Sequence, residues 1–176
     1  GGFCAAVGAA SARQVFQQCP EGTFNPAAGA SSNEACIVCP AGKANPIPGS
    51  SDPAACVDCM AGFYSSAPGA SYCSACEPGS HAALPGATVC AICSPGHWCT
   101  SLTQTPCEPG HYAASPGAGY CSVCETGSFA TQPSATACDN CAPGHWCTIS
   151  AQVRCGDNKF NMWSGSSNSS DCRSCP

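Results

Sequence analysis

The chain has 176 residues, of which 20 are cysteine and only 19 are Leu, Ile, Val or Phe. This composition excludes a large apolar core, and with it most enzyme folds of this length, and it marks a disulfide scaffold instead. The net charge is −5 and the few basic residues are scattered, whereas nucleic-acid binding needs clustered cations, so we expect neither an enzyme nor a nucleic-acid partner.

The cysteine content also indicates the compartment. So many cysteines beside so few core residues are typical of an oxidising environment, and no run of 18 apolar residues suggests a membrane-spanning helix. The sequence begins without an initiator methionine or an apolar leader, as expected of a processed or trimmed product. We therefore expect an extracellular or cell-surface protein of the secretory pathway, without membrane insertion of this segment.

Residues 1–18 differ from the rest of the chain. The stretch Ala5–Gln18 is rich in alanine and favours a short helix, although Gly8 weakens it. We expect this segment to be an N-terminal cap or docking segment, and an expression remnant is the alternative.

From Cys19 onward the chain is a tandem array of short units. Most units open at the second cysteine of a Cys-x-x-Cys pair, and successive openings are 20, 20, 17, 17, 14, 17, 17 and 14 residues apart. Such arrays contact mainly their neighbours along the chain. The openings are Cys19, Cys39, Cys59, Cys76, Cys93, Cys107, Cys124, Cys141 and Cys155. Each unit is named below by its opening cysteine, and position n is the nth residue after it.

A longer period lies on top of the units. Residues 59–106 align without gaps on residues 107–154, with 26 of 48 positions identical. We therefore divide the chain into two 20-residue units (19–58), a three-unit cassette (59–106), its duplicate (107–154) and a terminal unit (155–176).

Each unit follows one pattern of turns and rings. Position 3 is glycine in every unit except the last, which has Asn158, the next best residue at positive φ. Position 5 is usually an aromatic ring, and a second turn signal such as Pro68-Gly69 follows. This pattern predicts a turn, a short strand, a second turn and a return strand. The fold class is therefore a small disulfide-rich, mostly irregular or β protein, in which a tandem array of short β-hairpin units forms an elongated rod.

The preferred disulfide pairing joins the opening cysteine of each unit to its closing cysteine. A loop of about 15 residues closed in this way contributes about 3 kcal/mol in the chain-entropy model. The nine pairs are Cys19–Cys36, Cys39–Cys56, Cys59–Cys73, Cys76–Cys90, Cys93–Cys99, Cys107–Cys121, Cys124–Cys138, Cys141–Cys147 and Cys155–Cys172. Cys4 and Cys175 remain, and they are either partners between subunits, which would propagate as a fibre, or bonded to segments outside this sequence.

Other uses of Cys-x-x-Cys fit less well. Cys36–Cys39 followed by Cys56–Cys59 has the spacing of a zinc ribbon, but the seven such pairs are an odd number. A thioredoxin-like site needs one activated pair, and c-type haem needs a histidine after the pair. We therefore expect no catalytic residue, no metal and no cofactor.

The rings at position 5 carry two interpretations. Each ring covers its own disulfide, or the rings form a contact stripe for a neighbouring protein or glycan. The candidate stripe is Phe24, Tyr64, Trp98, Tyr112, Phe129, Trp146 and Phe160.

Four histidines, His81, His97, His111 and His145, lie in the same segments of their units. They are half-exposed flanking rings, or His97 and His145 bridge a metal between neighbouring units. Asn168-Ser169-Ser170 is the one sequon and predicts N-glycosylation at Asn168.

The unit resembles a known family of extracellular repeats. Cys107-Glu-Pro-Gly-His-Tyr112, followed by Pro116-Gly117 and Cys121-Ser-Val-Cys124, resembles the ephrin-receptor-like Cys-rich repeat. It is also similar to the first half of a tumour-necrosis-factor-receptor Cys-rich module. The resemblance covers about residues 19–176 and implies elongated extracellular β-hairpin modules with start-to-end disulfides, as in receptors and in protist or algal Cys-rich surface proteins.

Two functions remain after these observations. The near-regular repeats and low charge favour an extracellular structural protein, a filament or surface-coat subunit whose partner is itself, by head-to-tail or lateral assembly. The family resemblance favours a ligand- or adhesion-binding ectodomain of a larger receptor or antigen, with extracellular proteins and glycans as partners.

Overall fold

The structure is a computed structural model that describes residues 1–7, 13–28 and 30–175. These residues form short strands and three 3-10 helices, and none of them lies in an α-helix. The chain divides into two compact bodies, Gly1–Cys76 with Ala82–Ala91, and Glu77–His81 with Ile92–Pro176. No helix among the described residues is long and apolar enough to span a bilayer.

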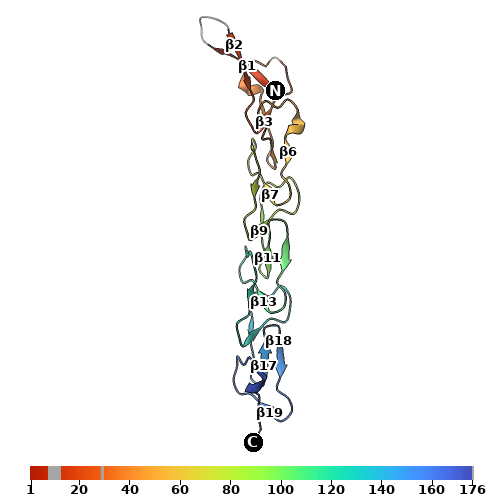
Figure 1. Ribbon diagram of the computed structural model, residues 1–176, viewed down its shortest axis with the longest axis vertical. Helices are drawn as coiled ribbons and strands as arrows, with labels where there is room; N and C mark the ends of the chain where they lie inside the picture. The colour runs from red at the N-terminus through yellow and green to blue at the C-terminus, as the bar shows by residue number, and fades with distance from the viewer. Residues whose placement is uncertain (8–12, 29, 176) are drawn as a thin grey trace. The chain divides into compact units, whose positions relative to one another are not determined.

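The structure confirms the expected fold of tandem two-stranded hairpins closed by disulfides (Figure 1). The first elements are β1 (Gly2–Val7), β2 (Arg13–Gln18), β3 (Thr23–Phe24), η1 (Asn33–Ala35), β4 (Ile37–Val38), β5 (Lys43–Ala44), η2 (Pro53–Ala55), β6 (Val57–Asp58), β7 (Phe63–Tyr64), β8 (Ser74–Ala75), β9 (Ser80–His81) and β10 (Ala91–Ile92). They are followed by β11 (His97–Cys99), β12 (Gln104–Pro106), β13 (His111–Tyr112), β14 (Ser122–Val123), β15 (Ser128–Phe129), β16 (Asp139–Asn140), β17 (His145–Thr148), β18 (Ala151–Arg154), β19 (Lys159–Phe160), η3 (Ser169–Asp171) and β20 (Arg173–Ser174).

The hairpins have a common register. In the seven units that end in a Cys-x-x-Cys pair, the strand that ends at position 5 pairs antiparallel with the two residues between these cysteines, so that Tyr64 lies opposite Ser74 and Tyr112 opposite Ser122. In the Cys93 and Cys141 units the strand pairs instead with the residues just before the next opening cysteine, as Trp98 does with Thr105. Strands of two residues are too short to be stable alone in water. Their stability must come from the cross-links and from the neighbouring hairpins.

The prediction of a helix in Ala5–Gln18 is wrong. The described residues of this stretch form β1 and β2, which pair antiparallel with Gly2 opposite Gln18 and Cys4 opposite Phe16. Alanine has the highest helix propensity, but intrinsic propensity is a weak preference that tertiary pairing overrides. The rest of the stretch, residues 8–12, lies outside the described residues.

Cysteines form most of the core. Cys19, Cys39, Cys93 and Cys141 are completely buried, and few of the other buried residues are large. Each disulfide therefore takes the place that apolar side chains have in an ordinary domain. This agrees with the cysteine-rich, core-poor composition.

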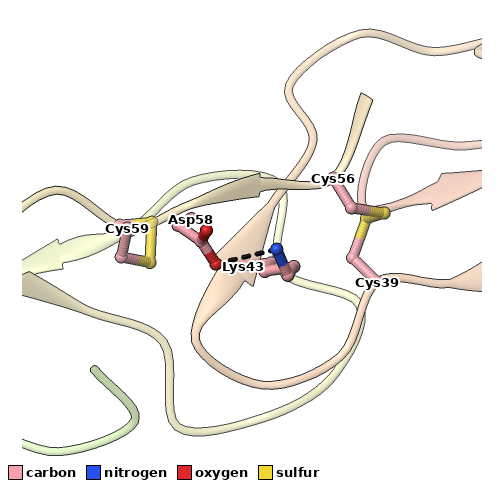
Figure 2. A network of polar contacts seen from close by, with 6 residues as sticks. Cys39, Lys43, Cys56, Asp58 and Cys59 are labelled. Carbon is pink, nitrogen blue, oxygen red and sulfur yellow. Dashed lines mark ion pairs between the residues drawn. A yellow bond between two sulfur atoms is a disulfide. The ribbon is translucent and has the colours of Figure 1, made fainter. Parts of the chain in front are cut away.

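One ion pair supports the Cys39 hairpin. Lys43 and Asp58 lie opposite each other on β5 and β6, and Lys43 Nζ is 2.8 Å from Asp58 Oδ1. Figure 2 shows this contact beside the Cys39–Cys56 disulfide. Both side chains are substantially exposed, so the pair contributes only about 0.2–1 kcal/mol.

Candidate assembly surface

At six of the eight junctions between neighbouring units in the described chain, one hairpin docks on the next through the same backbone hydrogen bonds. The N–H of position 3 donates to the carbonyl at position 6 of the following unit, as in Gly22 to Asn45 (2.7 Å) and Gly110 to Ala130 (2.8 Å). The N–H of position 6 then donates to the carbonyl at position 11 of the following unit, as in Asn25 to Ser50 (2.9 Å). These bonds require no particular side chain.

A third bond runs in the opposite direction. The mid-turn residue at position 10 donates its N–H to the carbonyl of the preceding unit's opening cysteine, as in Gly49 to Cys19 (2.8 Å) and Gly165 to Cys141 (2.9 Å). All three bonds are present at the junctions that begin with the units Cys19, Cys39, Cys59, Cys93, Cys107 and Cys141. We call them the docking bonds.

Glycine at position 3 also permits contact with the unit two places further on. A Cβ on Gly96, whose φ is +78°, would lie 2.2 Å from the carbonyl oxygen of Ser134. A side chain therefore cannot fit there without moving backbone. Gly144 has a similar φ of +80°, but a Cβ on it would meet nothing within 4 Å.

The small residue at position 6 is the buried contact point of each unit. It is Asn25, Asn45, Ser65, Ala82, Cys99, Ala113, Ala130, Cys147 or Asn161, and every one is at most 6% exposed. A large side chain at this position would hold neighbouring hairpins apart and break the docking bonds.

Three of these buried residues are asparagines, and each links two units. Asn45 Nδ2 donates to the Thr23 carbonyl of the preceding unit (2.9 Å), and its Oδ1 accepts from the N–H of Ile47 (3.0 Å). Asn25 and Asn161 make equivalent bonds. This role was not predicted from the sequence, although asparagine stands at position 6 of all three units with 17-residue loops.

The nine expected cysteine pairs are brought together in the structure. In the units Cys93 and Cys141, which we call the truncated units, the closing cysteine is itself position 6. Cys4 and Cys175 are left unbonded; Cys4 is half-buried and Cys175 is exposed.

Rings at position 5 are half-buried, except Phe129, which is buried. Phe129 does not cluster with the disulfide of its own unit, as the first interpretation of the rings expects. It packs with Cys141 and Cys147 of the following truncated unit. His81 occupies the same position in the first cassette, and its Nδ1 lies 3.4 Å from Cys99 Sγ of the following truncated unit. The other rings of the candidate stripe stay a prediction.

The histidines and the sequon have local partners. Nδ1 of His97 and of His145 lies 3.1 Å from the carbonyl of the proline two residues earlier. The described residues contain no group of three or more His, Cys, Asp or Glu side chains arranged to hold a metal ion.

The asparagine of the sequon, Asn168, is exposed and caps η3, accepting through Oδ1 from the N–H of Ser170 (3.0 Å).

One open groove lies in the first body. It has a volume of about 450 Å³ and is lined by Val57, Met60, Phe63 and Tyr72 among others. Met60 and Tyr72 are 70% and 76% exposed. The corresponding residues of the second cassette, 48 positions later, include Glu108 in place of Met60, so this apolar lining is not a property of the repeat itself.

Comparison with known proteins identifies no relative. No protein-family model matches the chain, and no curated protein matches it. The dense disulfides and repeated hairpins are those of an extracellular Cys-rich protein, and function has to be inferred from the geometry.

Proposed function

We propose that the protein is an extracellular structural protein, a subunit of a filament or surface coat. The observation that supports this most is the docking mode. One hairpin adds to the next through hydrogen bonds between backbone groups, as a strand adds to the edge of a sheet. A surface of this kind accepts a further hairpin of the same type, provided that its residue at position 6 is small.

The terminal Cys155 unit presents this surface again. Its equivalents of the docking groups are the N–H of Asn158, the N–H of Asn161 and the carbonyl of Cys155. Asn158 has a φ of +59°, so the turn at position 3 keeps the conformation of the glycine turns.

Negative-stain imaging of the native material tests this proposal. Filaments or an ordered coat that incorporate the chain are expected. Isolated particles at all concentrations would contradict it.

A binding ectodomain is the second candidate, because the groove near Phe63 and Tyr72 exposes a continuous apolar lining. Titration with the apolar fluorescent probe 8-anilinonaphthalene-1-sulfonate tests it. The Tyr72→Ala variant should weaken binding of the probe, while Tyr120→Ala, equally exposed in the second cassette, should leave it unchanged. Equal effects of the two variants would exclude the groove as the binding site.

A further inference from the structure

We propose that the Cys59 and Cys107 units each carry a binding site for a neutral β-linked glycan, in a groove between two tyrosines. This inference goes beyond the proposed structural role and does not depend on it. It starts from a feature that the two cassettes share, namely tyrosine at position 5 and again at position 13 of their first unit. The pairs are Tyr64 with Tyr72 and Tyr112 with Tyr120.

A groove opens beside the two rings in both units, and we call these the tyrosine grooves. The first has a volume of about 280 Å³ and the second of about 410 Å³. Both are lined by positions 5–11, 13 and 15 of the unit, and each lies within a single compact body. These volumes are near the lower end of the range of small-ligand sites, about 300–1,000 Å³, so they suit a short segment of a chain-like ligand.

The walls of each groove are fixed before any ligand binds. Tyr64 ends β7 and is paired with β8, while Tyr72 directly precedes the closing cysteine of its unit. Between them the chain turns at Gly69, whose φ is +81° and whose N–H donates to the carbonyl of the preceding unit's opening cysteine (2.8 Å). The Cys107 unit repeats this turn at Gly117, with a φ of +79° and a docking bond of 3.0 Å. A preorganised site loses little conformational entropy when a ligand binds.

The tyrosine pair is not required by the hairpin itself. The Cys76 and Cys124 units also close after 14 residues, but they have Val89 and Ala137 at position 13. Their rings at position 5, His81 and Phe129, contact the disulfide of the following truncated unit. Since hairpins of the same length form without it, the tyrosine pair distinguishes the first unit of each cassette and needs another explanation.

The lining residues indicate the class of ligand. All of them are uncharged, whereas strong recognition of a phosphate or a carboxylate uses a charged partner. A purely apolar ligand is bound by a mostly apolar pocket, whereas these grooves combine tyrosine rings with serine hydroxyls and the backbone of a Pro-Gly turn. The combination fits a neutral ligand that has both apolar faces and many hydroxyls.

The rings at position 13 are suited to stack against a sugar. Tyr72 and Tyr120 are each 76% exposed, and a tyrosine ring offers an apolar face together with a polar hydroxyl. In a β-linked glucan the hydroxyls are equatorial and both faces of each sugar carry C–H groups. A sugar lying flat on such a ring therefore brings its hydroxyls to the groove, where Ser74 and Ser122 at position 15 are also exposed.

A proline-rich peptide is the main alternative, because grooves lined by aromatic residues also bind polyproline segments. Serine, alanine, proline and glycine between the two tyrosines provide hydroxyls and backbone groups rather than the further rings that such grooves use. We therefore expect a glycan, and decaproline is included in the test.

Titration of the ¹⁵N-labelled chain with cellopentaose, laminaripentaose and chitopentaose, followed by NMR, tests the proposal. At least one of these neutral glycans should shift the amide signals of positions 5–13 in the Cys59 and Cys107 units and not in the Cys76 and Cys124 units. Trigalacturonate, which is anionic, should shift neither groove. The proposal would be overturned if no neutral glycan shifted these signals at millimolar concentration, if all four units shifted equally, or if trigalacturonate or decaproline bound the grooves better than the neutral glycans.

Variants of the exposed tyrosines assign the two sites. Tyr72→Ala should weaken binding in the Cys59 unit about tenfold or more and leave the Cys107 unit unchanged, and Tyr120→Ala should do the reverse. Val89→Ala is the matched control at position 13 of the Cys76 unit, 70% exposed, and should change neither site. Met60 lines the apolar groove but not the tyrosine groove, so Met60→Ala should leave glycan binding unchanged. Unchanged affinity in both tyrosine variants, or equal weakening by either control, would refute the sites.

Imaging and titration together distinguish this inference from the proposed function. Filaments formed by a chain that binds none of the glycans would refute the sites and leave the filament standing. Glycan binding by a chain that stays as isolated particles would refute the filament and leave the sites standing.

Discussion

Removing the side chain of Asn45 measures how much one buried polar contact contributes to hairpin docking. Asn45 is 0% exposed, and it bonds the Thr23 carbonyl of the preceding unit and the Ile47 N–H of its own turn. Asn45→Ala leaves the Ile47 N–H without its acceptor and removes one link between two units. A buried group that loses its partner costs about 1–3 kcal/mol, and the Ile47 N–H, which is only partly buried, costs about 1 kcal/mol at the lower end of that range, so we expect the variant to lose about 2–4 kcal/mol of local stability.

Amide hydrogen exchange is the suitable assay, because the disulfides limit global unfolding and local opening is what the change affects. At about 1.4 kcal/mol per tenfold change, exchange at Ile47 and at Gly22, whose N–H donates to the Asn45 carbonyl, should accelerate about 30- to 700-fold. Asn140→Ala is the matched control, since Asn140 is exposed on β16 and such changes stay within about 0.5 kcal/mol.

Two results would refute this reasoning. Acceleration of less than threefold at Ile47 would mean that the buried asparagine contributes nothing to docking. Equal acceleration in units far from Asn45 would mean that the array unfolds as one cooperative body and that nearest-neighbour coupling does not describe it.

Further outcomes follow from the same geometry. Gly96→Ala and Gly144→Ala both place alanine at positive φ, but only the first also meets a backbone oxygen, so thermal unfolding should show a melting temperature several degrees lower for Gly96→Ala. Trp98→Ala should raise hydrogen exchange only in its own unit and its immediate neighbours; loss of assembly with native disulfides would instead make the rings an interface. Phe129→Ala should expose the disulfide that the ring covers and speed its reduction by dithiothreitol in a timed alkylation experiment, and an unchanged rate would contradict that cover. The tandem repeats of the sequence predict an elongated chain, so small-angle scattering should give a radius of gyration well above the roughly 16 Å of a compact chain of this length; a value near 16 Å would contradict this prediction from the sequence.

The repeat pattern was sufficient to predict the hairpins because each is specified locally. Within the Cys107 unit, glycine at position 3 sets a turn, Tyr112 at position 5 marks the strand, and Cys121 closes the loop, all within 15 residues. The helix expected in the Ala-rich N-terminal segment was likewise predicted from local preferences. That prediction was wrong, because the pairing of β1 with β2 outweighs the helix propensity of alanine.

The contacts between units were not predictable in the same way. The docking bonds join backbone groups, so they leave no side-chain signature except the requirement for a small residue at position 6. Alanine, serine, cysteine and asparagine are all small enough for position 6. Because the residue type varies between units, the sequence shows no recognisable motif there. The likeness of Cys4 to the closing cysteines of the truncated units was hidden for a related reason. Its equivalence to Cys99 and Cys147 depends on strand register and on the bond to Ala30, while the 7-residue-longer hairpin that follows it obscures the likeness in sequence.

Docking through the backbone explains how one array accommodates units of three lengths. Units of all three lengths, closing after 17, 14 or 6 residues, offer the following unit the same groups, namely the carbonyl of the opening cysteine and the N–H groups of positions 3 and 6. Among the described residues, the acceptors at positions 6 and 11 are used only in units that close after 17 or 14 residues, and the junctions that lead into the truncated units lack the docking bonds. Length variation is therefore confined to the part of each hairpin that the next unit does not need.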